Sequence, residues 1–395
     1  MRIYIFLLLG LSLLCSSCRK EELIFVSDSS VVSIPVQLEA YQGFYLLNEG
    51  NMGMNRATID WFDYETGIYT RDIFSERNPT LPKELGDVGN DLKIYGKKAY
   101  ATINASNFVE VFDVETGKHL KQIHVPNCRY LAFDQGKVYV SSFSGKIEIN
   151  PNAEIGFVAE IDTLSLAVTR KVNVGYQPEE MVTYRNKLYV ANSGGYREPN
   201  YDTTVSVIDL TTFTELKKIE VAPNLHRMQV DANGDVYVSA RGNYKEILPS
   251  LYVIDSKVDE VKQKLAIPVS NMTIDEDVLY YYTSSYQTDT GNSTISYGLL
   301  NTNTKQIIRT SISTDGTEEQ LLMPYGITVN PETKEIFLTD AQDYIGNGYI
   351  YCLSAKGVLK WKVMAGNVPA HFAFIKKNNL KSAIEMRRDN KSKGK

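Results

Sequence analysis

One pattern recurs seven times along the 395-residue chain and limits the folds open to it. Each copy is a strand-like segment with alternating polar and apolar residues, followed by a second strand and, in most copies, by a third. The seven segments begin "GFYLLNEGN", "KAYATINAS", "KVYVSSFSG", "KLYVANSGG", "DVYVSARGN", "VLYYYTSSY" and "EIFLTDAQD". They recur roughly every 40–55 residues, which is the spacing of four-stranded propeller blades.

A short apolar run precedes six of the seven copies, and these runs centre on Leu92, Leu131, Met181, Met228, Met272 and Ile327. The copy at Gly43 lacks such a run, whereas the last copy is followed by a surplus one, "AHFAFI" at 370–375. If the surplus strand joins the first blade, the ring closes and no sheet edge stays open to aggregation. A solenoid is the alternative, but it would need capping repeats. We therefore predict an all-β, seven-bladed β-propeller over residues 34–375.

The N-terminal segment "MRIYIFLLLGLSLLCSSC" is typical of a secretory signal, because its apolar stretch of about a dozen residues is too short to span a membrane. The two serines before Cys18 resemble the lipobox of bacterial lipoproteins, in which lipidation tethers the mature chain to a membrane. The charges at 20–22 resemble an export signal for outer-surface lipoproteins. We predict a signal peptide over 1–17, a lipid-anchored linker over 18–33 and an outer-membrane, cell-surface location. A plain secretory peptide is the alternative.

The charge of the chain is unevenly distributed. The formal net charge is −5, but the tail at 376–395 has eight Lys and Arg residues against Glu385 and Asp389. The tail therefore carries +6 and leaves −11 on the rest of the chain. A moderately acidic body is a poor general binder of nucleic acid, so we expect no such partner. The basic tail is typical of a disordered segment.

Catalytic motifs with a fixed local spacing are absent from the sequence. It contains no G-x-S-x-G, no H-E-x-x-H, no phosphate loop and no G-x-G-x-x-G after a strand. The four histidines are not spaced as local metal ligands. "DANGD" at 231–235 lacks the closing glutamate of a calcium loop and fits a hairpin turn better. We therefore expect a non-enzymatic binding protein without a metal or a cofactor.

One face of the predicted ring gathers the candidate binding residues. Because the strands of a blade are antiparallel, the start of each inner strand and the loop after each second strand meet at the same face. The inner strands bring Asn90, Arg129, Glu179, His226, Ser270, Tyr325 and His371. The loops, rich in tyrosine and amide groups, cover 48–55, 104–107, 192–201, 241–244 and 340–344, with Phe143 and Tyr286. Such a rim suits a bulky polar organic ligand, and merely solvated loops are the alternative.

The repeated "KLYVANSGG…VSVIDLTT" with "KKIEV" resembles the YncE-like family of seven-bladed propellers over nearly the whole mature chain. The opening "FYLLNEGNMGMNRATIDWFD", together with the lipoprotein leader, more specifically resembles the BtuG-type surface lipoproteins. That resemblance implies capture of cobalamin, or a related corrinoid, and its transfer to a TonB-dependent outer-membrane transporter. Cobalamin would then be a transported ligand and not a cofactor.

A cobalamin site makes definite demands on the rim. The ligand is a rigid, largely uncharged macrocycle fringed with amides, and it carries one phosphate. It needs aromatic faces, amide partners and only one or two cations, because burying spare charge costs affinity. The predicted faces are Tyr196, Tyr244, Tyr286, Tyr325 and Tyr344, and the predicted amides are Asn51, Asn107 and Asn192. The predicted phosphate contacts are Arg129, Arg227 and Arg241, and His226 and His371 complete the site without coordinating cobalt.

Two other functions fit the same residues. An oligosaccharide also stacks on tyrosines and bonds to amides, so a glycan-binding propeller is one alternative. A propeller hydrolase or lyase is the other, since such enzymes assemble their sites from one residue per blade. Its acid and base groups would be Glu179, Glu180, His226 and His371.

Overall fold

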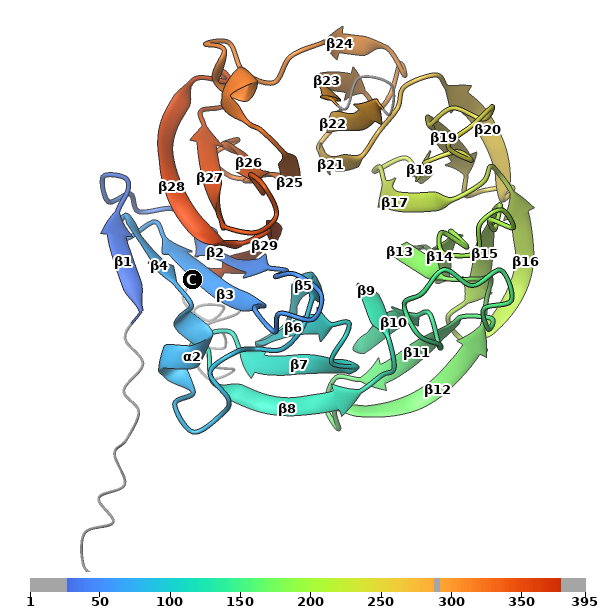
Figure 1. Cartoon of the computed structure of the whole chain (residues 1–395), viewed down its shortest axis with the longest axis horizontal. Coiled ribbons are helices and arrows are strands. Elements are labelled where there is room, and N and C mark those ends of the chain that lie inside the picture. The colour runs from blue at the N-terminus through green and yellow to red at the C-terminus, as the bar shows by residue number, and fades with distance from the viewer. Residues whose placement is uncertain (1–26, 288–291, 378–395) are drawn as a thin grey trace, which may run out of the picture.

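The computed structural model describes residues 27–287 and 292–377, which form seven antiparallel sheets arranged in a ring (Figure 1). The predicted all-β, seven-bladed propeller is confirmed. The strands of each blade are given from the ring centre outward. Blade two consists of β5 (Gly89–Tyr95), β6 (Lys98–Ile103), β7 (Phe108–Asp113) and β8 (His119–His124), and blade three of β9 (Cys128–Asp134), β10 (Lys137–Ser142), β11 (Phe157–Asp162) and β12 (Ala167–Asn173). Blade four consists of β13 (Pro178–Tyr184), β14 (Lys187–Asn192), β15 (Thr204–Asp209) and β16 (Thr214–Glu220).

The next three blades follow the same order. Blade five consists of β17 (Leu225–Val230), β18 (Asp235–Ala240), β19 (Ser250–Asp255) and β20 (Glu260–Leu265), and blade six of β21 (Asn271–Asp275), β22 (Val278–Gln287), β23 (Asn292–Asn301) and β24 (Ile307–Arg309). Blade seven consists of β25 (Pro324–Val329), β26 (Ile336–Asp340), β27 (Asn347–Leu353) and β28 (Leu359–Asn367). Over residues 27–287 and 292–376, helical structure is limited to α2 (Ile73–Arg77) and the short 3-10 helix Thr317–Gln320. Within the described ranges, no helix is long and apolar enough to cross a membrane.

The first blade closes the ring with strands from both ends of the chain. Its inner strand is the C-terminal β29 (Pro369–Lys376), which pairs antiparallel with β2 (Tyr41–Asn48), as the surplus apolar run predicted. β3 (Thr58–Asp63) and β4 (Ile68–Arg71) continue the sheet outward. A fifth strand, β1 (Asp28–Val31), pairs with β4 at the outer edge. This strand falls within the range 18–33 that was predicted as a linker, because its backbone covers the edge that β4 would otherwise leave open.

An aromatic cluster joins the two ends of the chain. Phe44 lies 5.2–5.8 Å, centroid to centroid, from Phe372 and Phe374 of β29, and 5.1 Å from Phe337 of β26 in the neighbouring blade. Phe44 and Phe337 are fully buried. Edge-to-face aromatic pairs of this kind add to the stabilisation that burial alone supplies. Ring closure therefore rests on both strand pairing and a packed core.

Four inner strands carry the same β-bulge near their first residues. In β9, β13, β17 and β25, two residues of the inner strand lie opposite a single residue of the second strand. The bulged pairs are Arg129 and Tyr130, Glu179 and Glu180, His226 and Arg227, and Tyr325 and Gly326. A bulge turns two successive side chains away from strict alternation. Each of these four inner strands therefore presents two successive residues, and not one, near its start.

In three of the four bulges, the residue opposite has a hydroxyl that accepts a hydrogen bond from a backbone amide of the bulge, whereas Ala191 lies opposite the bulge of β13. Ser141 of β10 accepts a hydrogen bond from the Tyr130 amide (3.0 Å) and donates one to the Glu179 carbonyl of the next blade (2.9 Å). Ser239 and Thr339 accept the corresponding amide bonds, at 3.0 and 2.6 Å. The hydroxyl thus stabilises both its own blade and the contact with its neighbour.

We expect Ser141→Ala to lower the free energy of unfolding by about 1–3 kcal/mol, because it leaves a buried amide and a buried carbonyl unpaired. Urea unfolding followed by circular dichroism measures this change. Ser285→Ala, at an exposed position of β22, is the control and should change stability by about 0.5 kcal/mol or less. Equal urea midpoints for the two variants would contradict the role given to Ser141.

Candidate ligand-binding site

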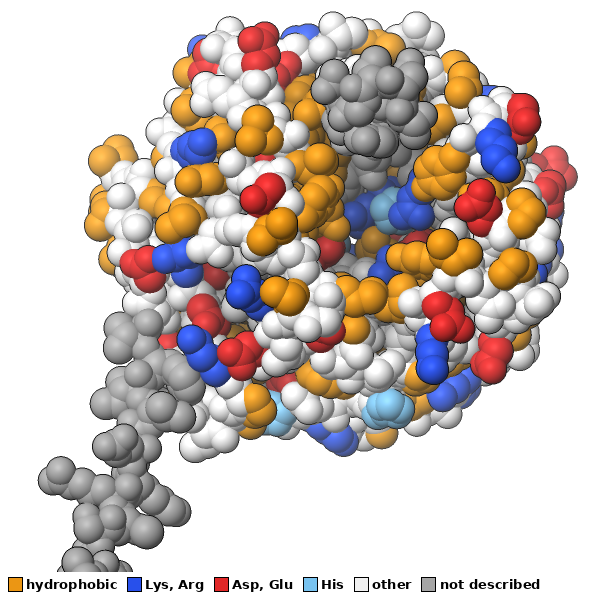
Figure 2. Space-filling model, viewed as in Figure 1, with side chains coloured by type: hydrophobic (Ala, Val, Ile, Leu, Met, Phe, Trp, Pro, Cys, Tyr) orange, Lys and Arg blue, Asp and Glu red, His pale blue; other side chains and the backbone are white. Residues whose placement is uncertain are grey.

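The starts of the inner strands surround a hollow at the centre of the ring. Figure 2 shows Lys or Arg and His side chains inside this hollow, with hydrophobic side chains around its margin. Adjacent inner strands contact one another all round the ring, so their first residues converge there. We call this region the channel mouth, and it comprises the bulged pairs together with Glu49, Asp91, Arg241, Tyr282 and His371.

Three arginines lie on one side of the channel mouth. Arg129 donates two hydrogen bonds to the same Glu179 oxygen, at 2.9 and 3.2 Å from its Nη2 and Nε atoms. Arg241 lies 3.8 Å from the other Glu179 oxygen. Arg129, predicted as a phosphate contact, is therefore already engaged by a carboxylate.

Arg227 differs from its two neighbours because no carboxylate oxygen of a described residue lies within 4 Å of its guanidinium, and the charge of buried Glu180 acts on it only from a greater distance. The residue is 7% exposed, and its Nε has no hydrogen-bond partner among the described residues. Within the same ranges it makes no ion pair shorter than 4 Å, and its guanidinium lies 5.2 Å from the centre of the Tyr130 ring. A buried cation without a carboxylate partner is costly unless something else supplies negative charge. Arg227 is therefore the group at the channel mouth most open to an anion.

The histidine beside these arginines is held neutral. His226 Nε2 lies 3.1 Å from the Tyr130 hydroxyl. Burial, together with the positive charges of Arg241 and Arg227, lowers the pKa of His226 well below 6.5. The net positive charge of this side at pH 7 thus comes from arginine alone.

The opposite side of the channel mouth is acidic. Glu49, which follows β2, accepts a hydrogen bond from the Tyr325 hydroxyl (2.6 Å), and its other oxygen lies 2.8 Å from His371 Nε2. His371 Nδ1 lies 3.7 Å from Asp91. The mouth is therefore polarised in net charge: blades three and five contribute three arginines around Glu179 and Glu180 of blade four, whereas blades one and two contribute Glu49 and Asp91.

Aromatic rings connect the two sides. Tyr130 is edge-on to both predicted histidines, 6.2 Å from His226 and 6.4 Å from His371 between ring centres. The Tyr282 hydroxyl donates to the Tyr325 carbonyl (2.6 Å), and the Tyr325 ring packs at 5.9 Å against Tyr344. These rings offer flat apolar area beside the charged groups, which is the composition of a site for a polar organic molecule.

The predicted rim tyrosines lie in the loops around this mouth. Tyr244 is 69% exposed and packs at 6.3 Å against Tyr201, and Tyr196 packs at 6.3 Å against Phe143. The Asn51 amide donates a hydrogen bond to the Tyr344 carbonyl, which ties the loop after β2 to the loop after β26. The rim therefore spans several blades.

One predicted amide contact is wrong. Asn192 is fully buried, and its amide is satisfied within its own blade. Its oxygen accepts from the Gly175 amide (3.0 Å), and its nitrogen donates to Thr204 and Ser206 (both 3.0 Å). An amide at the end of a buried strand is held by the neighbouring strand and cannot reach a ligand.

Several other residues that were predicted for the rim bind backbone groups or lie outside the channel mouth. Asn90 donates to the Arg129 carbonyl (3.2 Å) and Ser270 to the Ser284 carbonyl (3.2 Å), so both hold backbone. Tyr286 belongs to β22, but its side chain lies outside the described part of the structure, and so do Cys18 and residues 378–395. Asn107 lines a separate hollow between blades two and three.

The proposed acid and base groups do not form one cluster. Glu180 is buried, accepts a hydrogen bond from the Met228 amide (2.9 Å), and has its pKa raised by burial. Glu179 is bound by Arg129, whereas His371 lies across the channel mouth beside Glu49. Among the described residues, no group of three or more His, Cys, Asp or Glu side chains is arranged to hold a metal ion.

Sequence reasoning missed Tyr130, Tyr282 and Glu49. Tyr130 and Arg227 are the second residues of their bulges, and only the first residue of each pair follows from strict alternation. Arginine is a natural candidate for a phosphate contact, whereas Tyr130 resembles the many strand tyrosines. Glu49 lies in a loop range that was identified without selecting this residue.

These features define a seven-bladed propeller with a polarised, aromatic-lined mouth. A family model described as "Domain of unknown function (DUF5074)" matches residues 42–357, and the chain belongs to this family. No curated protein matches the chain.

Solved structures share the fold at low sequence identity. A hypothetical selenium-binding protein from Sulfolobus tokodaii has a TM-score of 0.60 at 10% identity, over 86% of this chain and 94% of its own. A quinonprotein alcohol dehydrogenase-like protein from Bacteroides thetaiotaomicron has a TM-score of 0.56 at 14% identity, over 85% and 79%. Apo AztD from Citrobacter koseri has a TM-score of 0.52 at 13% identity, over 86% and 99%. At these identities the likeness extends to the fold alone.

Proposed function

We propose that this protein is a non-enzymatic cell-surface lipoprotein that captures a bulky polar ligand at the channel mouth. The ligand class we infer is a corrinoid, with cobalamin as its leading member. A TonB-dependent outer-membrane transporter would receive the ligand. The proposal combines the resemblance of the sequence to the BtuG-type lipoproteins with the composition of the mouth.

The single observation that carries the proposal is the buried guanidinium of Arg227, which lies among aromatic rings and whose Nε has no hydrogen-bond partner among the described residues. A ligand that brings one anion into an otherwise uncharged surface would satisfy it, and a corrinoid with its phosphate has that composition. Arg241, only 3.8 Å from Glu179 and half-buried, is placed to share the phosphate. Charge-assisted hydrogen bonds from arginine to phosphate are stronger than neutral ones.

The same observation separates the corrinoid from a glycan. A neutral oligosaccharide can stack on Tyr244 and Tyr196, but it offers no negative charge to Arg227. Occupation of the mouth by such a sugar would desolvate the guanidinium further without compensation. The charge pattern therefore favours a ligand with one anionic group.

A panel of ligands tests this choice. Cyanocobalamin should raise the melting temperature of the protein and be recovered unchanged, because a ligand that binds only the folded state stabilises it. Maltoheptaose, a neutral oligosaccharide, should leave the melting temperature unchanged. A shift with the sugar alone would favour the glycan-binding alternative, and chemical conversion of any ligand would favour an enzyme.

Transfer to a transporter needs a surface that a second protein can contact. The loops around the mouth expose Ile149, Leu248 and Ile345, at 68–75% of their surface. Burial of apolar surface is a main driving force of protein–protein association. These exposed side chains support a partner that docks over the same face that holds the ligand.

The proposed location makes a prediction about Cys18. We expect Cys18→Ala to release the protein from the membrane fraction, because the lipid is the only anchor that the proposal gives it. Fractionation of cells followed by immunoblotting measures the release. A variant that still sediments with outer membranes would show that lipidation at Cys18 is not the anchor.

A further inference from the structure

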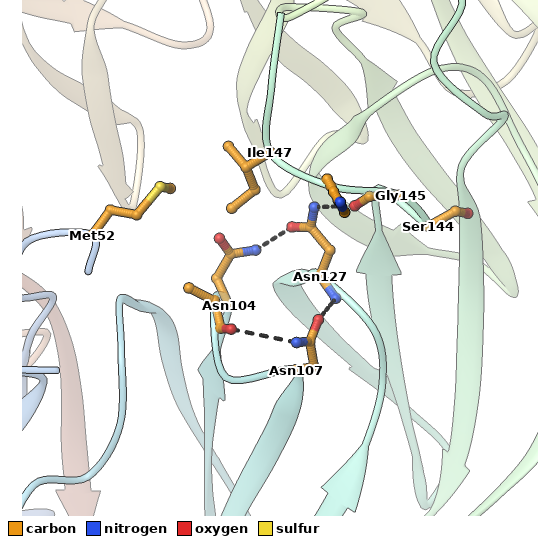
Figure 3. A pocket seen from close by; sticks show the side chains of 9 residues that line it. Met52, Asn104, Asn107, Asn127, Ser144, Gly145 and Ile147 are labelled. Carbon is orange, nitrogen blue, oxygen red and sulfur yellow. Dashed lines mark hydrogen bonds between the residues drawn. The ribbon is translucent and has the colours of Figure 1, made fainter. Parts of the chain in front are cut away.

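A second hollow lies between the loops of blades two and three, beside the channel mouth. It has a volume of about 400 Å³ and is lined by residues from four segments, among them Met52, Asn104, Asn127, Lys146 and Ile147. Figure 3 shows Met52 and Ile147 on two sides of it and the amide of Asn104 below them. A hollow of this volume can hold a small organic group.

A chain of amides fixes the orientation of Asn104. The Asn127 nitrogen donates to the Gly145 carbonyl (2.7 Å), and the Asn127 oxygen accepts from the Asn104 nitrogen. The Asn104 nitrogen also donates to the Cys128 carbonyl (2.9 Å). Because both bonds need an N–H donor at this position, the amide cannot be reversed without losing them. The other atom of the amide group must therefore be the oxygen.

That oxygen has no partner. Asn104 is 1% exposed, and its Oδ1 is buried without a hydrogen bond in the described ranges. In Figure 3 the oxygen points away from Asn127 toward the space between Met52 and Ile147. A buried acceptor without a donor is destabilising, and few remain in native proteins without a reason. A ligand that donates a hydrogen bond would satisfy it.

The loops that form the hollow are held in place. The amide of Gly53, next to Met52, donates to Asp87 at 2.8 Å, and the Asp87 amide donates to Ser106 Oγ at 2.9 Å. The Asn107 oxygen accepts from the Asn127 amide at 2.7 Å. The walls are thus positioned before any ligand enters, which reduces the entropy that binding would cost.

We propose that this hollow binds a neutral primary carboxamide on a short aliphatic arm. The carboxamide N–H would donate to Asn104 Oδ1, and its carbonyl would accept from the ammonium of Lys146, which lines the same hollow. The methylene groups would contact Met52 and Ile147. This site is separate from the arginines of the channel mouth and does not require the ligand there to be a corrinoid.

A carboxylate of the same shape is the informative competitor. It would be attracted by Lys146, but that side chain is exposed, and water screens such attractions strongly. It would also place a negatively charged oxygen against Asn104 Oδ1, leaving two acceptors without a proton between them. The buried contact at Asn104 Oδ1 outweighs the exposed contact with Lys146, so the hollow should bind the carboxamide more tightly than the carboxylate.

Saturation-transfer NMR of the protein with propionamide and with propionate tests this preference. We expect the propionamide signal to exceed that of propionate by about fivefold or more. Ile147→Trp fills the hollow from its half-buried loop and should abolish the signal, whereas Ile149→Trp, two residues further on and 75% exposed, should retain it. Asn104→Leu should also abolish it.

Each other outcome would overturn the inference: no signal from either probe, an equal or stronger signal from propionate, or a propionamide signal that survives Ile147→Trp. Because the probes contain no corrinoid, the test is independent of the function proposed above. Propionamide binding without cyanocobalamin binding would overturn only that function, and the reverse result would overturn only this site.

Discussion

A chain that ends at Val368 will not form a stable propeller. This truncation removes β29, so β2 loses its antiparallel partner over Tyr41–Asn48 and Phe44 loses two of its ring contacts. Loss of one large apolar side chain from a core costs about 3–5 kcal/mol, and β29 contributes Phe372, Phe374 and Ile375 together. The summed loss is comparable to the whole stability of a domain, about 5–15 kcal/mol.

Circular dichroism during heating and size-exclusion chromatography measure this effect. The truncated protein should lack a cooperative thermal transition and should aggregate through the open edge of β2. A chain that ends at Lys377 is the matched control, because it keeps all of β29 and removes only residues 378–395. A cooperative transition at an unchanged temperature in the shorter chain would contradict ring closure by β29.

Arg227→Gln should weaken cyanocobalamin binding by roughly 10- to 100-fold, the range expected for one charge-assisted hydrogen bond. The substitution keeps a polar side chain in the bulge of β17 but removes the buried positive charge and its unpaired Nε. Isothermal titration calorimetry measures the change in Kd. Because Arg227 makes no close ion pair with a described residue, its removal breaks no direct carboxylate contact there, and buried Glu180, which loses the charge of Arg227, can take up a proton, so the fold should be retained.

Two controls separate a phosphate contact from a structural effect. Arg185→Gln makes the same charge change in the turn after β13, at the other face of the ring, and should leave binding unchanged. Dicyanocobinamide lacks the phosphate and the base, so its affinity should be nearly equal for the native protein and Arg227→Gln. An equal loss for both corrinoids would contradict the phosphate role of Arg227.

The fold was predictable because its signal is repeated and local. Seven copies of one strand pattern and a surplus C-terminal strand determine the blade number and the closure, and β29 pairs with β2 as expected. β1 was not expected, because its segment "DSSV" lacks the alternation that marks the other strands.

The site was predictable only in part, because it depends on register and on distant partners. Strand alternation selects one residue per inner strand, whereas the bulges add Tyr130 and Arg227. The Arg129–Glu179 pair joins residues 50 positions apart in different blades, so no local pattern distinguishes Arg129 from the less engaged Arg227. The prediction for Asn192 failed for a related reason: the sequence places this residue at the start of a loop, but the structure buries it at the end of a strand.

Titration of the native protein with cyanocobalamin in a calorimeter decides whether the channel mouth binds a corrinoid. We expect saturable binding of one ligand per chain, with a large favourable enthalpy from the aromatic contacts and the phosphate–arginine hydrogen bonds. The absence of measurable heat at micromolar protein, at two temperatures, would contradict this expectation and leave the mouth as a site for a different ligand.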